Sequence, residues 1–264
     1  MRKPSTRRVR SGLPEIDIME TGDSRALLLG SDTVQSEMNL DDPSALMLSY
    51  TRAMMGGLLF VAQPDNILHI GLGGGSMLRF CHHRLPETDN TVVELHPQVI
   101  AVARSMFQVP EDSDRLRIIA GDGIEFMATT EAQYSMILVD AFDGFEIVQD
   151  TVSEPFLHDC QQALKAGGAL VLNLWGSDPR FARQLAVVQQ VFDGWAFALP
   201  ASTHGNIAVI ALKLPVSQTT LRWDTLTERA QTLETEFGIE FEAFVTRLKA
   251  ENAHTAQRLL PASV

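Results

Sequence analysis

The chain has 264 residues, of which 45% are hydrophobic and 20% charged, a balance that supports one large folded domain, or one domain with a small appendage, and excludes general disorder. Its 33 acidic residues outnumber 21 basic ones, and five of the basic residues lie within residues 1–10, so the rest of the chain is strongly acidic. An acidic body repels phosphate, which argues against a nucleic-acid partner, and it favours a cationic substrate.

Metal sites, disulfide frameworks and membrane spans find no support in the sequence. Two cysteines, Cys81 and Cys160, cannot form a disulfide framework, and no Cys/His cluster has zinc-binding spacing, so we expect no metal. No apolar run reaches the ~18 residues of a membrane span, so we expect no membrane association. The basic N-terminus is not followed by the apolar stretch of a secretory signal, and we therefore expect a cytoplasmic protein.

The first 57 residues predict an arm followed by a small β region. Residues 1–14 are basic and contain two prolines and a glycine, which is typical of a flexible arm. Short apolar runs separated by glycine-containing turns then predict a β-meander with strands at 16–19, 26–29 and 33–36. Asp42-Pro43-Ser44 is expected to open a helix that continues through Met55, because proline is tolerated in a first helical turn. We assign residues 15–57 to this β region and its linking helix.

From residue 58 to residue 215, strand and helix patterns alternate. The predicted strands are 66–70, 91–95, 115–120, 136–140, 169–174, 196–199 and 207–212. The predicted helices are 76–85, 97–107, 123–130, 153–165 and 179–192, the fourth closed by Gly167-Gly168. Apolar strands separated by helices predict the α/β class, a Rossmann-like, mostly parallel seven-stranded sheet with helices on both faces and an antiparallel pair at one edge. Residues 216–264 predict a helical C-terminal segment, broken at Gly238.

A glycine loop separates the first strand of this sheet from its helix. The glycines have G-x-G-x-G spacing at Gly71, Gly73 and Gly75, and Ser76 stands where a dinucleotide loop has its third glycine. Without side chains the backbone can approach a ligand, and the helix N-terminus adds unpaired N–H groups. The spacing is similar to the loop of S-adenosylmethionine-dependent transferases. Glu94 ends the next strand, where an acid can hold the two hydroxyls of a ribose.

Further acids follow the third and fourth strands of this sheet. Asp122 lies in the turn that ends with Gly123, and we expect both residues to contact the donor. Asp122 can accept a hydrogen bond from an adenine amino group, or it can cap the next helix. Asp140 and Asp143 lie where the sulfonium of the donor is expected. A carboxylate there can take the proton of an attacking amine and attract a cationic acceptor, and turn or cap chemistry is the alternative for both.

Residues 60–175 resemble the catalytic domain of the spermidine synthase family, the polyamine aminopropyltransferases. The resemblance is carried by IGLGGGSMLR, VVELHPQVI, the turn at Asp122, YSMILVDAFDG and FLHDCQQALKAGGALVLNLW. The N-terminal meander with Gln35 also resembles the small β-domain of that family. The resemblance implies a homodimer in which Glu94 binds the ribose, Asp122 contacts the adenine, Asp140 is the catalytic base and Gln35 contacts the donor.

The chain also departs from the family pattern at positions expected to contact the donor tail and the acceptor. The loop aspartate that helps to hold the ammonium of decarboxylated S-adenosylmethionine falls on Gly74. The acidic pair of the family falls on Asp41-Asp42, but the tyrosine-containing segment that follows it is replaced here by residues 43–46. The later tyrosine-bearing acceptor loop is replaced by residues 201–205. The contacts to the donor nucleoside are therefore retained, whereas those to the acceptor are largely changed.

Three functional hypotheses follow from these observations. The first is transfer of an aminopropyl group from decarboxylated S-adenosylmethionine to a small amine, a diamine or polyamine, in polyamine biosynthesis. The second is an S-adenosylmethionine-dependent methyltransferase on the same scaffold, which Gly74 and the missing tyrosines favour. The third is a nucleoside-binding protein without catalysis, against which the retained Asp140 argues.

Overall fold

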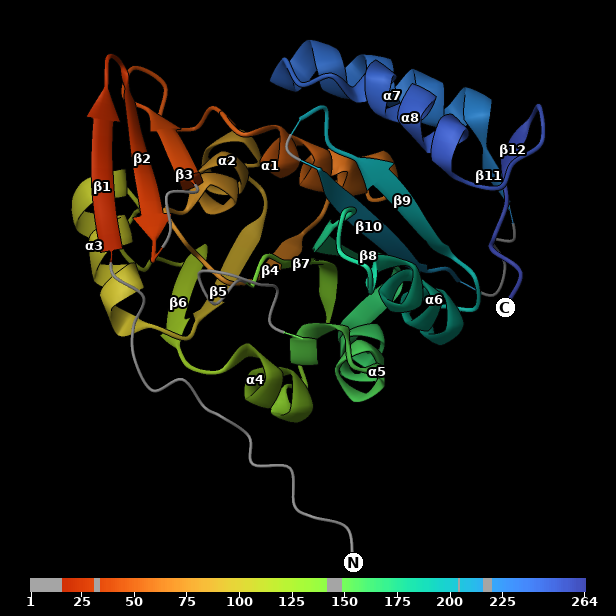
Figure 1. The fold of residues 1–264 in the computed structure, drawn as a ribbon, viewed down its shortest axis with the longest axis horizontal. Helices are drawn as coiled ribbons and strands as arrows, with labels where there is room; N and C mark the ends of the chain where they lie inside the picture. Colours follow the sequence, from red (N-terminus) through yellow and green to blue (C-terminus); the bar gives the residue numbers. More distant parts are fainter. Residues whose placement is uncertain (1–15, 31–33, 142–148, 204, 216–219) are drawn as a thin grey trace, which may run out of the picture.

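A computed structural model describes residues 16–30, 34–141, 149–203, 205–215 and 220–264. The arm predicted for residues 1–14 and the predicted substrate-binding residue Asp143 lie outside these residues. The N-terminal meander is confirmed as a three-stranded antiparallel sheet of β1 (Ile16–Thr21), β2 (Ser24–Leu29) and β3 (Val34–Asn39). It lies beside α3 (Pro97–Phe107), and Leu27 and Met38 pack there against Phe107 (Figure 1).

The linking helix begins later than the sequence predicts. The helix α1 spans Ser49–Met54 and continues as the 3-10 helix η1 (Met55–Leu59). Asp42 does not cap a helix, because its Oδ1 accepts hydrogen bonds from the backbone N–H and the hydroxyl of Ser44. Its Oδ2 forms an ion pair with Arg84, 2.7 Å away. The Asp-Pro-Ser sequence is therefore a turn tied to α2 (Ser76–Arg84).

The central sheet has seven strands in the order β6-β5-β4-β7-β8-β10-β9, and it confirms the predicted α/β class. The first five strands in this order are parallel, and β10 and β9 form the predicted antiparallel pair at one edge. The strands are β4 (Asn66–Ile70), β5 (Asp89–Glu94), β6 (Leu116–Ala120), β7 (Tyr134–Val139), β8 (Leu164–Trp175), β9 (Ala196–Pro200) and β10 (Asn206–Lys213).

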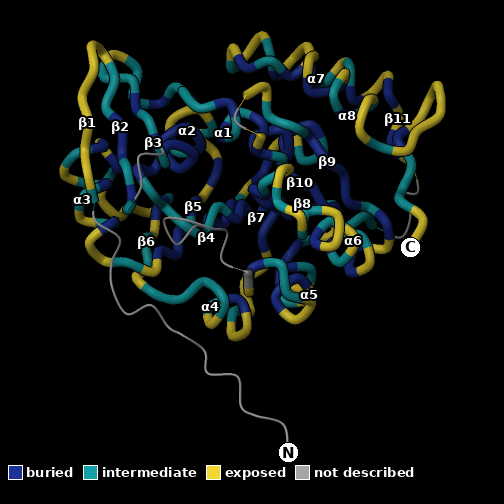
Figure 2. Tube along the Cα trace, in the orientation of Figure 1, coloured by how far each residue is buried: buried dark blue, intermediate teal, exposed yellow. Residues whose placement is uncertain are grey.

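Helices cover both faces of this sheet, and successive residues of a strand face opposite layers. On β7, Met136 and Leu138 belong to the hydrophobic cluster with α1 and η1, whereas Ile137 and Val139 belong to the cluster with α5 and α6. Such strands read as continuous apolar runs, and Figure 2 shows burial concentrated along them. The remaining elements of this unit are α4 (Gly123–Thr129), η2 (Gln149–Val152), α5 (Glu154–Ala163) and α6 (Phe181–Val191).

The predicted boundary between α5 and β8 is wrong. The helix ends at Ala163 and the strand begins at once, so Gly167 lies within β8 rather than at a helix end. The pairing of β8 with β7 shifts register between Tyr134 and Met136. Between these two positions, β8 has more residues than β7. Gly167 lies in this stretch with a φ of 85°, a backbone conformation that suits glycine, and so lets β8 accommodate the additional residues.

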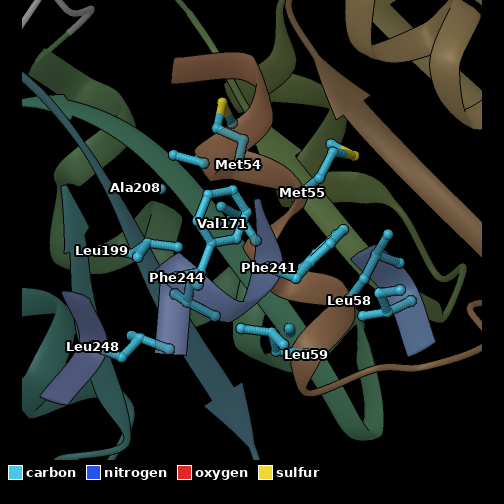
Figure 3. Packing of buried hydrophobic residues seen from close by; sticks show 14 of the residues in the cluster. Met54, Met55, Leu58, Leu59, Val171, Leu199, Ala208, Phe241, Phe244 and Leu248 are labelled. Carbon is cyan, nitrogen blue, oxygen red and sulfur yellow. The ribbon is translucent and has the colours of Figure 1, made fainter. Parts of the chain in front are cut away.

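The C-terminal segment consists of β11 (Leu221–Arg222), α7 (Trp223–Phe237), α8 (Phe241–Glu251) and β12 (Arg258–Leu259). The two helices and the break at Gly238 are confirmed. The two-residue strands were not predicted, because so short a pair has no periodicity. Phe241, Phe244 and Leu248 of α8 pack under α1 and η1 together with Val171 of the sheet (Figure 3). The domain boundaries proposed after residues 57 and 215 stay predictions. This hydrophobic core contains residues from both sides of each boundary.

We expect His69 to make the stability of this sheet depend on pH. Its Nε2 lies 3.0 Å from Oδ1 of Asn90, and burial lowers the pKa of His69 to about 4. In the unfolded chain the pKa of histidine is about 6.5. The fold keeps His69 neutral, so the protein loses no stability through this residue above that pH and loses stability as the pH falls from there towards 4. We expect the free energy of unfolding in urea to fall by about 2 kcal/mol from pH 7 to pH 5 on this account. His69→Gln should reduce the slope, and an equal slope in both proteins contradicts the assignment.

Candidate active site

The predicted site residues lie along one edge of the central sheet, at the carboxyl ends of neighbouring strands. The glycine loop follows β4, Glu94 ends β5, Asp122 comes two residues after β6 and Asp140 directly follows β7. Because β6, β5, β4, β7 and β8 are adjacent in that order, these residues share one edge. Parallel α/β sheets bind ligands in this position.

The glycine loop combines a close backbone contact with open space. Gly71 has a φ of 93°, and a Cβ there would lie 2.3 Å from the carbonyl oxygen of Asp140. A side chain at this position would therefore separate the ends of β4 and β7. Gly73 also has a positive φ, of 53°, and a Cβ there would meet no atom within 4 Å. The surface of the loop at Gly73 is accordingly open to a ligand.

Glu94 is held rigidly beside this loop. Its side chain is buried, Oε2 accepts a hydrogen bond from the backbone N–H of Leu72 at 2.8 Å, and Oε1 accepts one from the N–H of His96 at 2.9 Å. Each carboxylate oxygen has a further lone pair, so both can still accept a hydrogen bond from a ligand hydroxyl. The geometry suits the predicted binding of a ribose diol.

Asp122 and Gly123 have structural contacts as well as their predicted ligand roles. Asp122 is the N-cap of α4, and its Oδ1 accepts the N–H of Ile124 at 2.8 Å. Its Oδ2 has no partner among the described residues, which leaves it for an adenine amino group. A Cβ on Gly123 would lie 2.5 Å from Cγ2 of Ile70, so glycine is needed where α4 begins against β4. Binding of a ligand by Gly123 stays a prediction.

Asp140 is half-buried, and each oxygen of its carboxylate has a hydrogen-bond donor beside it. Nδ2 of Asn173 donates to Oδ1 at 2.9 Å, and the hydroxyl of Tyr50 lies 3.2 Å from Oδ2. Burial raises the pKa of Asp140 above its ordinary value, and the two hydrogen bonds lower it in part. Burial and the nearby carboxylate raise the pKa of Tyr50 well above its ordinary value, so the hydroxyl keeps its proton.

Tyr50 and Asn173 were missed at the sequence level. The missing tyrosine was sought directly after Asp42, whereas Tyr50 reaches the site from α1, eight residues later. It is one of only two tyrosines in the chain, which was an available signal. Asn173 is the polar residue within the apolar run of β8, a position where a buried amide needs a partner.

The backbone of Gln35 places β3 beside Tyr50 and Asp140. Its carbonyl oxygen lies 2.9 Å from the hydroxyl of Tyr50, so the N-terminal sheet meets α1 beside Asp140. The predicted contact between the side chain of Gln35 and the donor stays a prediction.

Gly74, where the family has an aspartate, has no room for a side chain. A Cβ there would lie 2.6 Å from Oγ and 2.9 Å from Cβ of Ser36 on β3, and 3.2 Å from Cδ1 of Phe107. Ser36 is itself fixed, because its Oγ lies 2.8 Å from Oγ of Ser76. Ser36 therefore leaves no space for the aspartate that the family has at the position of Gly74.

Arg79 holds the glycine loop in place through hydrogen bonds to backbone carbonyl oxygens. Its guanidinium is fully buried and donates to the carbonyl oxygens of Gly74, Phe107 and Pro43, the last at 2.7 Å. Burial lowers the pKa of Arg79 to about 10, so it remains charged at neutral pH. The loop is thus tied to α3 and to the turn before α1.

The described residues contain no group of three or more His, Cys, Asp or Glu side chains able to hold a metal ion. None of the helices in the described ranges is both long enough and apolar enough to span a membrane. Cys81 and Cys160 are buried free thiols, and burial raises the pKa of both.

Residues 47–191 match the family model described as the spermine/spermidine synthase domain. A polyamine aminopropyltransferase of Chromobacterium violaceum is 46% identical over 97% of this chain and 99% of its own length. One from Neisseria meningitidis is 44% identical over 95% of both chains. These relatives confirm the resemblance found in the sequence.

Solved structures share the fold. A probable spermidine synthase from Corynebacterium glutamicum has a TM-score of 0.69 at 23% identity, covering 93% of this chain and 97% of its own. Human methyltransferase-like protein 13, in complex with SAH, has a TM-score of 0.61 at 25% identity over 72% of this chain and 89% of its own. The family model covers more than half of the chain and the curated relatives nearly all of it, so this protein is a transferase that belongs to the spermine/spermidine synthase family.

Proposed function

We propose that this protein transfers the aminopropyl group of decarboxylated S-adenosylmethionine to a small diamine of the putrescine type. The observation that carries the proposal is the half-buried Asp140 carboxylate, placed between the hydroxyl of Tyr50 and the amide of Asn173 at the edge of the sheet that holds the glycine loop. Membership of the polyamine aminopropyltransferases supports the reaction class.

In this proposal the donor nucleoside lies along the edge formed by β6, β5 and β4. The oxygens of Glu94, fixed by two backbone N–H groups, accept from the ribose hydroxyls. Oδ2 of Asp122 accepts from the adenine amino group, and the open surface at Gly73 allows the donor to lie against the backbone. Gln35 on β3 is the proposed further contact.

The proposed transfer is a displacement at carbon. The lone pair of the acceptor amine attacks the methylene carbon bonded to the sulfonium, the carbon–sulfur bond breaks, and its electron pair remains on sulfur, releasing 5′-methylthioadenosine. The acceptor amine is protonated at neutral pH and must lose this proton before its lone pair can attack, and Asp140 accepts the proton. Burial raises the pKa of Asp140, which makes its carboxylate a better proton acceptor than an exposed aspartate.

The direct test is an assay of the purified protein with decarboxylated S-adenosylmethionine and a panel of diamines and polyamines. We expect release of 5′-methylthioadenosine together with an acceptor product heavier by one aminopropyl group, both detected by mass spectrometry. S-adenosylmethionine with the same acceptors is the control. No turnover with any diamine or polyamine of the panel overturns the proposal.

Methyl transfer from S-adenosylmethionine is the second candidate, favoured by Gly74 and by the likeness to human methyltransferase-like protein 13. That likeness covers 72% of the chain, whereas the aminopropyltransferase of Chromobacterium violaceum matches over 97% at higher identity. A methylated product in the control assay would identify this activity.

The contact between Gly74 and Ser36 gives a prediction about donor choice. Gly74→Asp alone should destabilise the protein, because the new side chain meets Ser36. Ser36→Gly together with Gly74→Asp removes that contact, and urea unfolding should show a coupling of about 0.5–3 kcal/mol between the two changes. Calorimetry on the double variant should show a stronger preference for the decarboxylated donor, which lacks the carboxylate that the introduced aspartate would repel. Strictly additive effects on stability contradict the coupling.

The homodimer and the cytoplasmic location stay predictions. Sedimentation at several protein concentrations tests the first, and fractionation of cells that produce the protein tests the second.

A further inference from the structure

Two buried asparagine side chains extend from Asp140 across the sheet. Nδ2 of Asn173 on β8 donates to Oδ1 of Asp140 at 2.9 Å, and Nδ2 of Asn206 on β10 donates to Oδ1 of Asn173 at 3.0 Å. Asn173 is 4% exposed and Asn206 6% exposed. Both amides are therefore removed from water, and their orientation depends on each other and on the carboxylate.

The sheet topology explains why the three residues meet. The strands β7, β8 and β10 are neighbours in the sheet. Val139 pairs with Leu172, so Asp140 and Asn173 continue that register one step further. Asn206 is opposite Trp175, two residues along β8 from Asn173, and diagonal neighbours of this kind lie on one face of a sheet.

The hydrogen bonds along this row have a fixed direction. An ionised carboxylate only accepts, so Asn173 must present its NH₂ group to Asp140. Its carbonyl oxygen then needs a donor, which Asn206 supplies. If the amide of Asn173 turned over, its carbonyl oxygen would face the carboxylate, and its NH₂ would face the NH₂ of Asn206.

We propose that Asn206 is a positioning residue for the transfer reaction: it holds the Asn173 amide so that its NH₂ group faces Asp140, and so keeps the carboxylate ready to accept a proton. The proposal rests on the proposed function for the role of Asp140 as the base. Asn206 lies one strand further from Asp140 than Asn173 does, and it acts only through Asn173.

The other groups around Asp140 do not replace this contact. Tyr50 on α1 is the titratable side chain that meets Asp140 among the described residues, and it occupies the other carboxylate oxygen. The amides of Asn173 and Asn206, from β8 and β10, are neutral. Loss of Asn206 should therefore act on Oδ1 and leave the contact at Oδ2 in place.

The test is a ¹³C NMR titration of the Asp140 carboxyl in protein labelled at the aspartate carboxyl carbons, with Asp140→Asn identifying the signal. Asn206→Leu keeps the size of the side chain and removes the donor. We expect the pKa of Asp140 to rise by roughly half to one unit, since one hydrogen bond to a charged group is weakened. Asn206→Ser, which keeps a hydroxyl donor, should shift it less. If Asn206→Leu does not fold, Asn206→Ala replaces it.

The matched control is Asn90→Leu. Asn90 is as buried as Asn206 and bonds to His69, but it lies at the opposite, amino-terminal end of the parallel strands. This variant should lose stability without moving the Asp140 titration. An unchanged pKa in the folded Asn206 variants, or an equal shift in Asn90→Leu, overturns the proposal.

The pH profile of aminopropyl transfer connects the titration to catalysis. In Asn206→Leu the acidic limb of kcat/KM should move to higher pH by the same amount, while kcat well above that limb stays within about twofold of the parent. A shifted titration with an unshifted profile overturns the catalytic part of the inference. A parent protein that transfers no aminopropyl group refutes the proposed function instead, and the titration still decides whether Asn206 orients Asn173.

Discussion

Asp140→Asn should lower kcat for aminopropyl transfer by about 10²- to 10⁴-fold, the range expected when a general base is removed. Asparagine preserves the shape of the side chain and its contacts. Its carbonyl oxygen can accept from Asn173, and its NH₂ can donate to the hydroxyl of Tyr50, which can then donate to the carbonyl of Gln35. The variant should therefore fold and bind the donor nucleoside with an affinity close to that of the parent.

Stopped assays give kcat, and calorimetry with 5′-methylthioadenosine gives the affinity. Asp65→Asn is the matched control, because Asp65 immediately precedes β4 at the amino-terminal end of that strand, where it bonds to Ser135 and Lys165. We expect this control to keep its turnover. A fully active Asp140→Asn protein rejects Asp140 as the base and makes Asp143, which lies outside the described residues, the next carboxylate to test.

Glu94→Gln should weaken the binding of 5′-methylthioadenosine by about 10- to 150-fold, which corresponds to about 1.5–3 kcal/mol for a lost charged hydrogen-bond acceptor. Both oxygens of Glu94 accept backbone N–H groups. The NH₂ group of glutamine would face one of those donors, so the change disturbs either the glycine loop at Leu72 or the backbone at His96 in addition to the ribose contact.

The 2′-deoxy analogue of the nucleoside separates these two effects. The parent should distinguish the two nucleosides clearly, and Glu94→Gln should distinguish them much less, whatever happens to the loop. Glu125→Gln, on the exposed side of α4, is the control for charge. If Glu94→Gln binds both nucleosides as the parent does, the ribose assignment is wrong.

Elements set by local sequence were the most predictable. The strand β4 and the helix α3 begin and end where the sequence predicts, because an apolar run and a proline in the first helical turn act locally. The two boundary errors have tertiary causes. Asp42 is engaged by Arg84 of α2, and the end of α5 is determined by the pairing of Leu164 with Tyr134.

The residues of the candidate active site also divide into those that local sequence predicts and those that depend on tertiary packing. The glycine loop and the strand-end acids were predictable, because a parallel sheet brings the carboxyl ends of its strands to one edge. Tyr50, Asn173 and Asn206 were not identified, since each reaches Asp140 only after non-adjacent parts of the chain have packed. The coupling of Gly74 to Ser36 depends in the same way on how β3 lies against the loop.

The packing of α1 has a consequence for synthesis on the ribosome. Tyr50 is made early, but α1 and η1 are covered by Phe241, Phe244 and Leu248 near the end of the chain (Figure 3). Arg52, two residues after Tyr50, also pairs with Glu240 at 3.0 Å. We therefore expect a nascent chain that already contains every strand of the central sheet to lack a fixed position for Tyr50 until α8 has left the exit tunnel. On this expectation the edge that binds the donor assembles before Tyr50 is placed beside Asp140.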